Sequence, residues 1–182
     1  MTEAREPSYD LSTQRLRLHA LSLDEARLAL VGDLGALGRA LGAAIPPGWP
    51  GKDLTDALSD IVPQMQRQAS DERWLWVAIE PGSANVIGDI GFHGPVTGSP
   101  TVELGYLILP DYQGRGYATE AAEAMIAWAA ERPGVDRVIV RIAHHNVRSL
   151  RVAAKLGMRE TVSHEPIYRR FERVVHRSQL HP

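Results

Sequence analysis

The stretch that decides the fold is Gln113-Gly114-Arg115-Gly116-Tyr117-Ala118. It follows an apolar run, residues 104–109, and it opens a helical pattern that continues to Ala130. A strand, a glycine-rich turn and a helix start predict an anion-binding cradle, because the turn aims backbone N–H groups at one point and the helix N-terminus adds a positive dipole end. Glycines let the backbone approach a phosphate closely, and Arg115 adds charge. We therefore expect a phosphate-bearing ligand here.

The rest of the chain alternates between strand and helix patterns, which predicts an α/β fold. Strands are expected over residues 14–20, 74–79, 85–93, 102–109 and 137–143, and within 158–164 and 167–179; helices are expected over 22–34, 37–44, 53–70, 119–130 and 146–156. Ser22 and Glu25 form a capping box, and Pro63 should kink or divide its helix. The strands expected over residues 74–79, 85–93 and 102–109 are joined by short turns, which predicts an antiparallel meander. The strand after the glycine loop and its helix should pair in parallel.

Composition narrows the class of protein. A chain of 182 residues with 44% hydrophobic and 23% charged residues predicts one domain, residues 1–182, with residues 1–12 as a loose arm. The absence of cysteine excludes a disulfide framework, a cysteine-ligated metal and a cysteine nucleophile. We expect a cytoplasmic protein, because the start is polar and no apolar run approaches the ~20 residues that span a bilayer. The net charge of −2 argues against general nucleic-acid binding.

The order of elements and two motifs resemble the GNAT superfamily of N-acetyltransferases. Its acyl-CoA loop reads Gln/Arg-x-x-Gly-x-Gly/Ala, and Gln113 through Ala118 fit every position. A second element of the family matches Asn146, Ser149 and Leu156-Gly157-Met158. The resemblance covers roughly residues 12–180 and is closest to the RimJ/RimL-like branch, which includes ribosomal-protein N-terminal acetyltransferases. A Rossmann fold is disfavoured, because its glycine loop follows an early strand, whereas this one follows a meander.

The resemblance implies a fold and a reaction. The fold is a central mixed, mostly antiparallel sheet of about seven strands, splayed between the fourth and fifth strands and flanked by helices. The reaction moves the acetyl group of acetyl-CoA to a primary amine by direct attack in a ternary complex. We expect no metal, because adjacent His144 and His145 have no ligand partner at helical spacing. Dimerisation is common in such enzymes, so a homodimer is an open expectation.

The resemblance also assigns the acetyl-CoA site. The pyrophosphate is expected on backbone N–H groups of Gln113, Gly114, Arg115, Gly116, Tyr117, Ala118 and Thr119. The backbone of Leu107, Ile108 and Leu109 is expected to pair with the pantetheine arm and to donate an N–H to the thioester carbonyl. Asn146 is expected to hydrogen-bond the pantetheine arm, although an Asn at this place also suits a helix N-cap.

Two residues are candidates for the chemistry. Glu103 is the leading base, acting on the amine through water, and the alternative is a structural carboxylate. Ser149 is the candidate for protonating the leaving thiolate, because the tyrosine that many family members carry four residues later is Ala153 here. His93 is a secondary base or a polar strand-end residue. Glu165 and Tyr168 are weaker candidates for the acceptor site.

Two other functions stay open from the sequence. One is an acyltransferase that uses a longer acyl donor, and the other is a non-catalytic acyl-CoA-binding sensor or interaction module. The acceptor is also open between a protein N-terminus and a small-molecule amine. Trp49, Trp74 and Trp76 are expected in the core or in groove walls.

Overall fold

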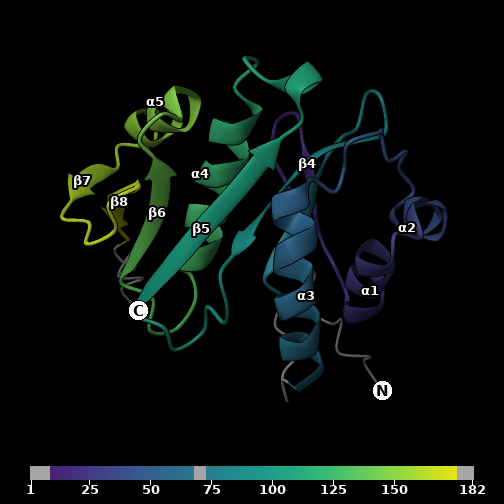
Figure 1. Cartoon of the computed structure of the whole chain (residues 1–182), viewed down its shortest axis with the longest axis horizontal. Helices are drawn as coiled ribbons and strands as arrows, with labels where there is room; N and C mark the ends of the chain where they lie inside the picture. Colours follow the sequence, from purple (N-terminus) through teal and green to yellow (C-terminus); the bar gives the residue numbers. More distant parts are fainter. Residues whose placement is uncertain (1–8, 68–72, 176–182) are drawn as a thin grey trace, which may run out of the picture. The chain divides into compact units, whose positions relative to one another are not determined.

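The computed structural model describes residues 9–67 and 73–175 and confirms a mixed α/β fold (Figure 1). Its strands are β1 Leu11–Ser12, β2 Arg17–Ala20, β3 Leu75–Glu80, β4 Asn85–Phe92, β5 Thr101–Ile108, β6 Arg137–Ala143, β7 Arg159–Thr161 and β8 Tyr168–Val174. Its helices are α1 Leu23–Val31, α2 Leu34–Leu41, α3 Lys52–Arg67, α4 Tyr117–Ala130 and α5 Val147–Lys155. The strand order is β1-β2-β3-β4-β5-β6-β8-β7. The sheet has eight strands rather than about seven, because the two-residue β1 was not predicted.

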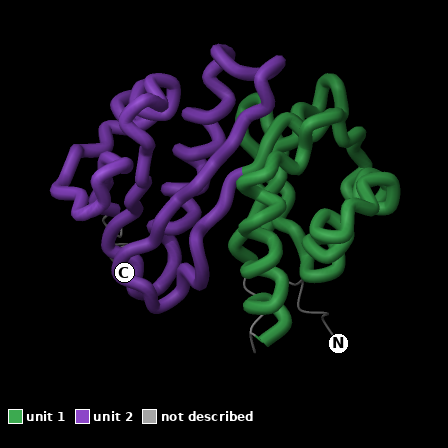
Figure 2. The backbone as a smooth tube through the Cα atoms, in the orientation of Figure 1, with its two compact units in different colours: residues 1–89 green, residues 90–182 purple. Residues whose placement is uncertain are grey.

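The chain forms two compact units, residues 1–89 and 90–182 (Figure 2). The boundary falls inside β4. A single domain over residues 1–182 therefore stays a prediction.

In the first unit, β1, β2 and β3 pair antiparallel around an apolar core. The three tryptophans predicted for the core are Trp49, Trp74 and Trp76, and each is at most 2% exposed. Local signals set the helix ends. Ser22 and Glu25 form the predicted capping box of α1, while α2 begins earlier than predicted because Asp33 caps it. Helix α3 runs through Pro63 without division.

Residues 9–12 of the predicted loose arm are held in place, so that prediction was wrong for them. Leu11 and Ser12 form β1 on β2, and the Asp10 carboxylate accepts the backbone N–H of Ala20 at 3.0 Å. The carbonyl of Tyr9 accepts the indole N–H of Trp76 at 2.9 Å. A composition-based reading misses such anchoring because it depends on partners far away in sequence. Residues 1–8 of the predicted arm lie outside the described residues.

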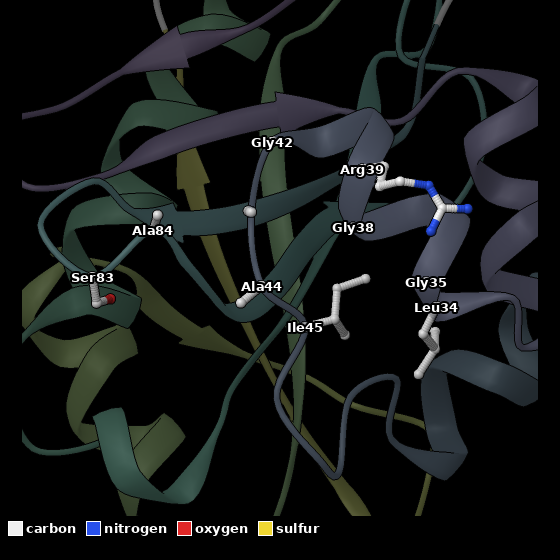
Figure 3. Close-up of a pocket in the computed structure, with 10 residues that line it drawn as sticks. Leu34, Gly35, Gly38, Arg39, Gly42, Ala44, Ile45, Ser83 and Ala84 are labelled. Atoms are coloured by element: carbon white, nitrogen blue, oxygen red, sulfur yellow. The ribbon is translucent and has the colours of Figure 1, made fainter.

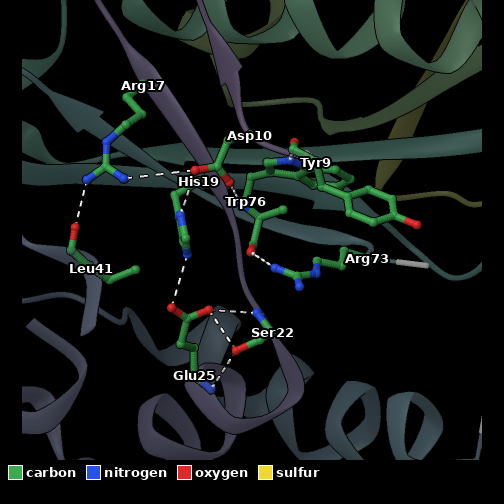
Figure 4. A network of polar contacts seen from close by, with 10 residues as sticks. Tyr9, Asp10, Arg17, His19, Ser22, Glu25, Leu41, Arg73 and Trp76 are labelled. Carbon is green, nitrogen blue, oxygen red and sulfur yellow. Dashed lines mark hydrogen bonds and ion pairs between the residues drawn. The ribbon is translucent and has the colours of Figure 1, made fainter. Parts of the chain in front are cut away.

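His19 links this segment to α1 (Figure 4). Its Nδ1 lies 2.9 Å from Asp10 Oδ2, and its Nε2 lies 3.1 Å from Glu25 Oε1. The bond to Glu25 raises the pKa of His19, with burial opposing and Asp10 adding to the rise. Burial works against ionisation of Glu25 too, but hydrogen bonds from His19 and Ser22 lower its pKa to about 2. The contribution of this network to the stability of the fold therefore depends on pH.

In the second unit, β5 and β6 pair in parallel, as the crossover predicted, and β8 lies antiparallel between β6 and β7. Helix α4 buries Ala122, Met125, Ile126 and Ala129, which is the face predicted from their spacing. The pairing of β5 with β6 covers only three residues and ends at Glu103 opposite Ile139. Beyond that point β5 continues to Ile108 and β6 to Ala143, and the two strands diverge (Figure 1). This gap between β5 and β6 is the splay that the family resemblance predicts between the fourth and fifth expected strands.

Candidate functional site

The glycine loop leads into α4 from the end of β5 that does not pair with β6. Gly114 and Gly116 have φ of 77° and 85°, in the left-handed region that favours glycine. No atom lies within 4 Å of the position that a Cβ on Gly114 would occupy. The loop backbone is therefore open to a ligand at Gly114.

Side chains within the loop fix its shape. The Gln113 amide donates to the carbonyl of Ile108 at 2.7 Å, and the Arg115 guanidinium donates to the carbonyl of Asp111 at 2.9 Å. The same guanidinium lies over the ring of Tyr112, 5.6 Å from its centroid. Two of the predicted ligand-binding residues thus also build the loop.

Helix α4 has no side-chain cap, whereas Ser22, Asp33 and Asn146 cap α1, α2 and α5. The first N–H groups of a helix have no intrahelical acceptor, and the helix dipole is positive at that end. Tyr117, Ala118 and Thr119 form this first turn. Gly116, the N-cap of α4, has no side chain to accept from this turn, so an anion at the start of α4 would supply an acceptor there.

Glu103 belongs to a polar cluster, which we call the Glu103 cluster: Glu103 on β5, Arg141 on β6, His93 after β4 and Glu165 before β8. Arg141 Nε donates to the Glu103 carboxylate at 2.7 Å, and His93 Nδ1 lies 3.3 Å from the same oxygen. Arg141 also donates to Glu165 at 2.5 Å. The cluster places two predicted candidates, His93 and Glu165, near Glu103, and adds Arg141.

The cluster determines the protonation of Glu103. Burial alone would raise the pKa of Glu103, but the contacts with His93 and Arg141 outweigh it and lower the pKa. The bonds to Glu103 and Glu165 in turn raise the pKa of Arg141. The carboxylate is therefore ionised and held in one position at neutral pH.

Asn146 and Ser149 lie at the start of α5, which follows β6. Asn146 is the N-cap, and its Oδ1 accepts the backbone N–H of Ser149 at 3.1 Å. The structure thus bears out the helix-cap reading of Asn146, which leaves the amide NH₂ end of its side chain available for a ligand. The residue at the position of the family tyrosine, Ala153, is buried in the unit.

Tyr106 was not predicted as a site residue. It lies on the part of β5 beyond the pairing with β6, and its hydroxyl is buried. Leu107 is half-buried, while Ile108 and Leu109 are buried. Tyr168, a weak acceptor-site candidate, lies at the start of β8 opposite Ala143.

The first unit carries a separate hollow of about 520 Å³ between α2 and Ala84 (Figure 3). Arg39 and Ser83 are the polar side chains among its described lining residues. None of these described lining residues has a carboxylate or an imidazole for proton transfer. Within residues 9–67 and 73–175, no helix is long and apolar enough to cross a membrane, and no group of three His, Asp or Glu side chains could hold a metal ion.

Comparison with known proteins identifies the class that this fold and loop define. The family model of the acetyltransferase (GNAT) domain matches residues 15–159. The chain belongs to this family and is an acetyltransferase.

Individual relatives agree with the family match. The chain is 27% identical over 148 residues to the uncharacterized N-acetyltransferase YjdG of Bacillus subtilis, covering 81% of this chain and 88% of YjdG. Its fold is similar to that of the ribosomal-protein-S5-alanine acetyltransferase of Vibrio fischeri, with a TM-score of 0.59, 15% identity and coverage of 95% and 99% of the two chains. It is also similar to the ribosomal L7/L12 acetyltransferase RimL in complex with coenzyme A, with a TM-score of 0.62, 14% identity and coverage of 93% and 99%.

Proposed function

We propose that the protein transfers the acetyl group of acetyl-CoA to a primary amine, and that acetyl-CoA binds in the second unit. The observation that carries the proposal is the continuous path from the unpaired edge of β5 to the uncapped start of α4. An unpaired strand edge offers N–H and C=O groups to an extended ligand that has amides of its own. The pantetheine arm is such a ligand, and the backbone of Leu107, Ile108 and Leu109 would pair with it.

The loop and α4 would hold the pyrophosphate. The Gln113 N–H already donates to the Pro110 carbonyl at 3.2 Å, so the backbone N–H groups from Gly114 to Thr119 would hold the pyrophosphate. The helix dipole favours the negative charge. Arg115 adds a positive charge beside the loop. The NH₂ end of the Asn146 side chain would donate to the pantetheine arm while the Oδ1 end caps α5.

In the transfer step, the amine nitrogen attacks the thioester carbonyl carbon and the C–S bond breaks. Glu103 attracts the acceptor ammonium and takes its proton through water. Because the Glu103 cluster lowers the pKa of this carboxylate, Glu103 passes the proton on to solvent rather than keeping it. The leaving thiolate takes a proton from the Ser149 hydroxyl. The amine and the thioester thus become an amide and a thiol. No cysteine is present to form an acyl-enzyme.

The acceptor class is tested by CoA release, measured with a thiol-reactive dye across N-terminal peptides and small amines. The names of the relatives favour peptides as the first panel. The absence of cysteine keeps the background of the dye low. We expect turnover with one acceptor class, and a decrease of about 10²–10⁴-fold in the matched Glu103→Gln variant.

The same panel separates the alternatives. Tight acetyl-CoA binding with no turnover on any acceptor would contradict catalysis and favour an acyl-CoA sensor. Faster turnover with a longer acyl-CoA would favour the longer donor. Undiminished turnover in Glu103→Gln would be consistent with an acetyltransferase but would show that Glu103 is not its base.

A further inference from the structure

The His93 ring lies across the strand that carries Glu103. The backbone N–H of His93 donates to the Glu103 carbonyl at 2.9 Å, and its ring Nδ1 lies 3.3 Å from Glu103 Oε1. The other end of the ring lies over Gly105, since a Cβ built on this glycine would be only 2.9 Å from His93 Nε2. Glu103 and Gly105 are two residues apart and so share one face of β5. The ring therefore occupies the space that a side chain at position 105 would fill.

The direction of the contact with Glu103 follows from the charges. Burial acts to raise the pKa of Glu103, but the contacts with His93 and Arg141 lower it, so the carboxylate is ionised and has no proton to donate. The His93 Nδ1 must therefore be the donor, and in a neutral imidazole the lone pair is then on Nε2. Of the two ring nitrogens, it is the one over Gly105 that can take up a proton.

Along β5, this nitrogen lies nearer than Glu103 to the edge assigned to the pantetheine arm. That edge begins at Leu107, four residues beyond Glu103 and two beyond Gly105. At about 3.3 Å per residue, Leu107 is roughly 13 Å along the strand from Glu103 and roughly 7 Å from Gly105. The His93 side chain is also 57% exposed, against 17% for Glu103. An exposed imidazole can exchange protons with solvent, whereas Arg141 already binds the Glu103 carboxylate at 2.7 Å.

We propose that His93 is the catalytic residue through which Glu103 acts as base: Nε2 takes the acceptor proton, and Gly105 is a positioning residue that leaves room for the ring. The inference rests on the proposed function and puts this ring in the place of the water between the acceptor and Glu103.

The protons balance along this route. The acceptor ammonium gives one proton to His93 Nε2 and becomes the attacking amine, while the ionised Glu103 stabilises the imidazolium. The imidazolium then releases this proton to solvent. When the C–S bond breaks, its electron pair goes to sulfur, and the former amine nitrogen loses its second proton to solvent. Ser149, which protonates the sulfur, regains a proton from solvent.

The kinetic test is a double-mutant cycle on the full chain with His93→Gln, Gly105→Ala and the double variant. We expect His93→Gln to lower kcat about 10²–10⁴-fold, with KM for acetyl-CoA unchanged. The methyl group of Gly105→Ala should push the ring aside and leave the fold intact, because a terminal ring can swing away. Its kcat should fall roughly 10²-fold, which a misplacement of about 1 Å can cause.

Two comparisons make this test specific. In the His93→Gln background Gly105→Ala should have no further effect, because Gly105 acts through His93. Gly82→Ala is the matched control and should keep full activity, since no atom lies within 4 Å of a Cβ built on Gly82. Full kcat in either single variant, or an equal loss from Gly105→Ala in both backgrounds, would overturn the inference.

A second measurement does not depend on turnover. In protein that carries nitrogen-15 histidine, the His93 ring signals are assigned by their loss in His93→Gln, and their chemical shifts report which ring nitrogen bears the proton. At alkaline pH we expect the proton on Nδ1 in the unmodified protein and in Gly82→Ala. The preference for Nδ1 should weaken in Glu103→Gln and in Gly105→Ala, because the hydrogen bond to the carboxylate sets it.

The outcomes separate this inference from the proposed function. A proton on Nε2 in the unmodified protein, or an unchanged preference in Gly105→Ala, would overturn the inference even in an active enzyme. The expected preference in a protein that never releases CoA would keep the contact between His93 and Glu103 but overturn the proposed function, and with it the catalytic role of His93.

Discussion

Gly114→Ala tests the proposed phosphate site, and Gly157→Ala is its matched control. Both glycines have left-handed backbones, with φ of 77° and 66°, and no atom lies within 4 Å of a Cβ built on either. The two substitutions therefore impose the same kind of backbone strain and no clash with the protein. They differ in place, because Gly114 lies in the loop before α4 and Gly157 follows α5.

The expected magnitudes follow from this geometry. An L-residue in the left-handed region costs roughly 1–2 kcal/mol, so both variants should lose about that free energy of unfolding. Only in Gly114→Ala does the new methyl group lie where the pyrophosphate is expected. Losing one hydrogen bond to a charged group costs about 1.5–3 kcal/mol, which corresponds to a Kd for acetyl-CoA that is roughly 10–150-fold weaker.

The assay is titration calorimetry with acetyl-CoA, together with urea unfolding of both variants and the unmodified protein. We expect similar losses of stability in the two variants and a loss of affinity in Gly114→Ala alone. If neither variant loses affinity for acetyl-CoA, the assignment of the pyrophosphate to this loop is refuted. A loss of affinity in both would show that binding follows general stability instead.

Three further predictions concern charge. Arg141→Gln removes a group that lowers the pKa of Glu103, so the acidic limb of the kcat/KM profile should move to higher pH; an unmoved limb would mean that Glu103 does not control the rate. Because the pKa of His19 is raised in the folded protein, its contribution to stability is complete below the unfolded pKa near 6.5 and is lost as the pH rises through the folded pKa. The melting temperatures of His19→Gln and the unmodified protein should therefore converge toward alkaline pH. Burial raises the pKa of Asp89 to about 7, although a bond from the Trp49 indole opposes it, so the fold loses stability as the pH rises from about 4 to 7. Asp89→Asn should remove this slope and gain about 1–3 kcal/mol at pH 8 in urea unfolding, and a retained slope would assign the effect to another group.

The sequence was sufficient where a structural signal is local. The strand, the left-handed glycines and the start of α4 fall within one short stretch, and the Ser22–Glu25 capping box spans one helical turn. Alternation and glycine spacing report such features directly. The parallel pairing of β5 and β6 also followed, because a crossover of this length leaves few alternatives.

The contacts that determine the chemistry of the site were not predictable in this way. Arg141 reaches Glu103 from 38 positions away and Glu165 from 24 positions away. Neither pair has a spacing rule, since both depend on how the strands of the second unit lie beside one another. The predicted roles of Glu103 and Ser149 stay predictions, but the structure shows which neighbours would modify them.

The uncapped start of α4 gives the ligand a thermodynamic role in folding. A bound anion would accept hydrogen bonds from the first turn of α4, so part of the stability of the second unit would come from the ligand rather than from the chain. By mass action, acetyl-CoA at a hundred times its Kd would add about 2.7 kcal/mol to the free energy of unfolding. Hydrogen exchange should locate that gain at Ala118 and Thr119, whose amides would become protected as the acetyl-CoA concentration rises. The stability of this protein would then vary with the supply of its own substrate.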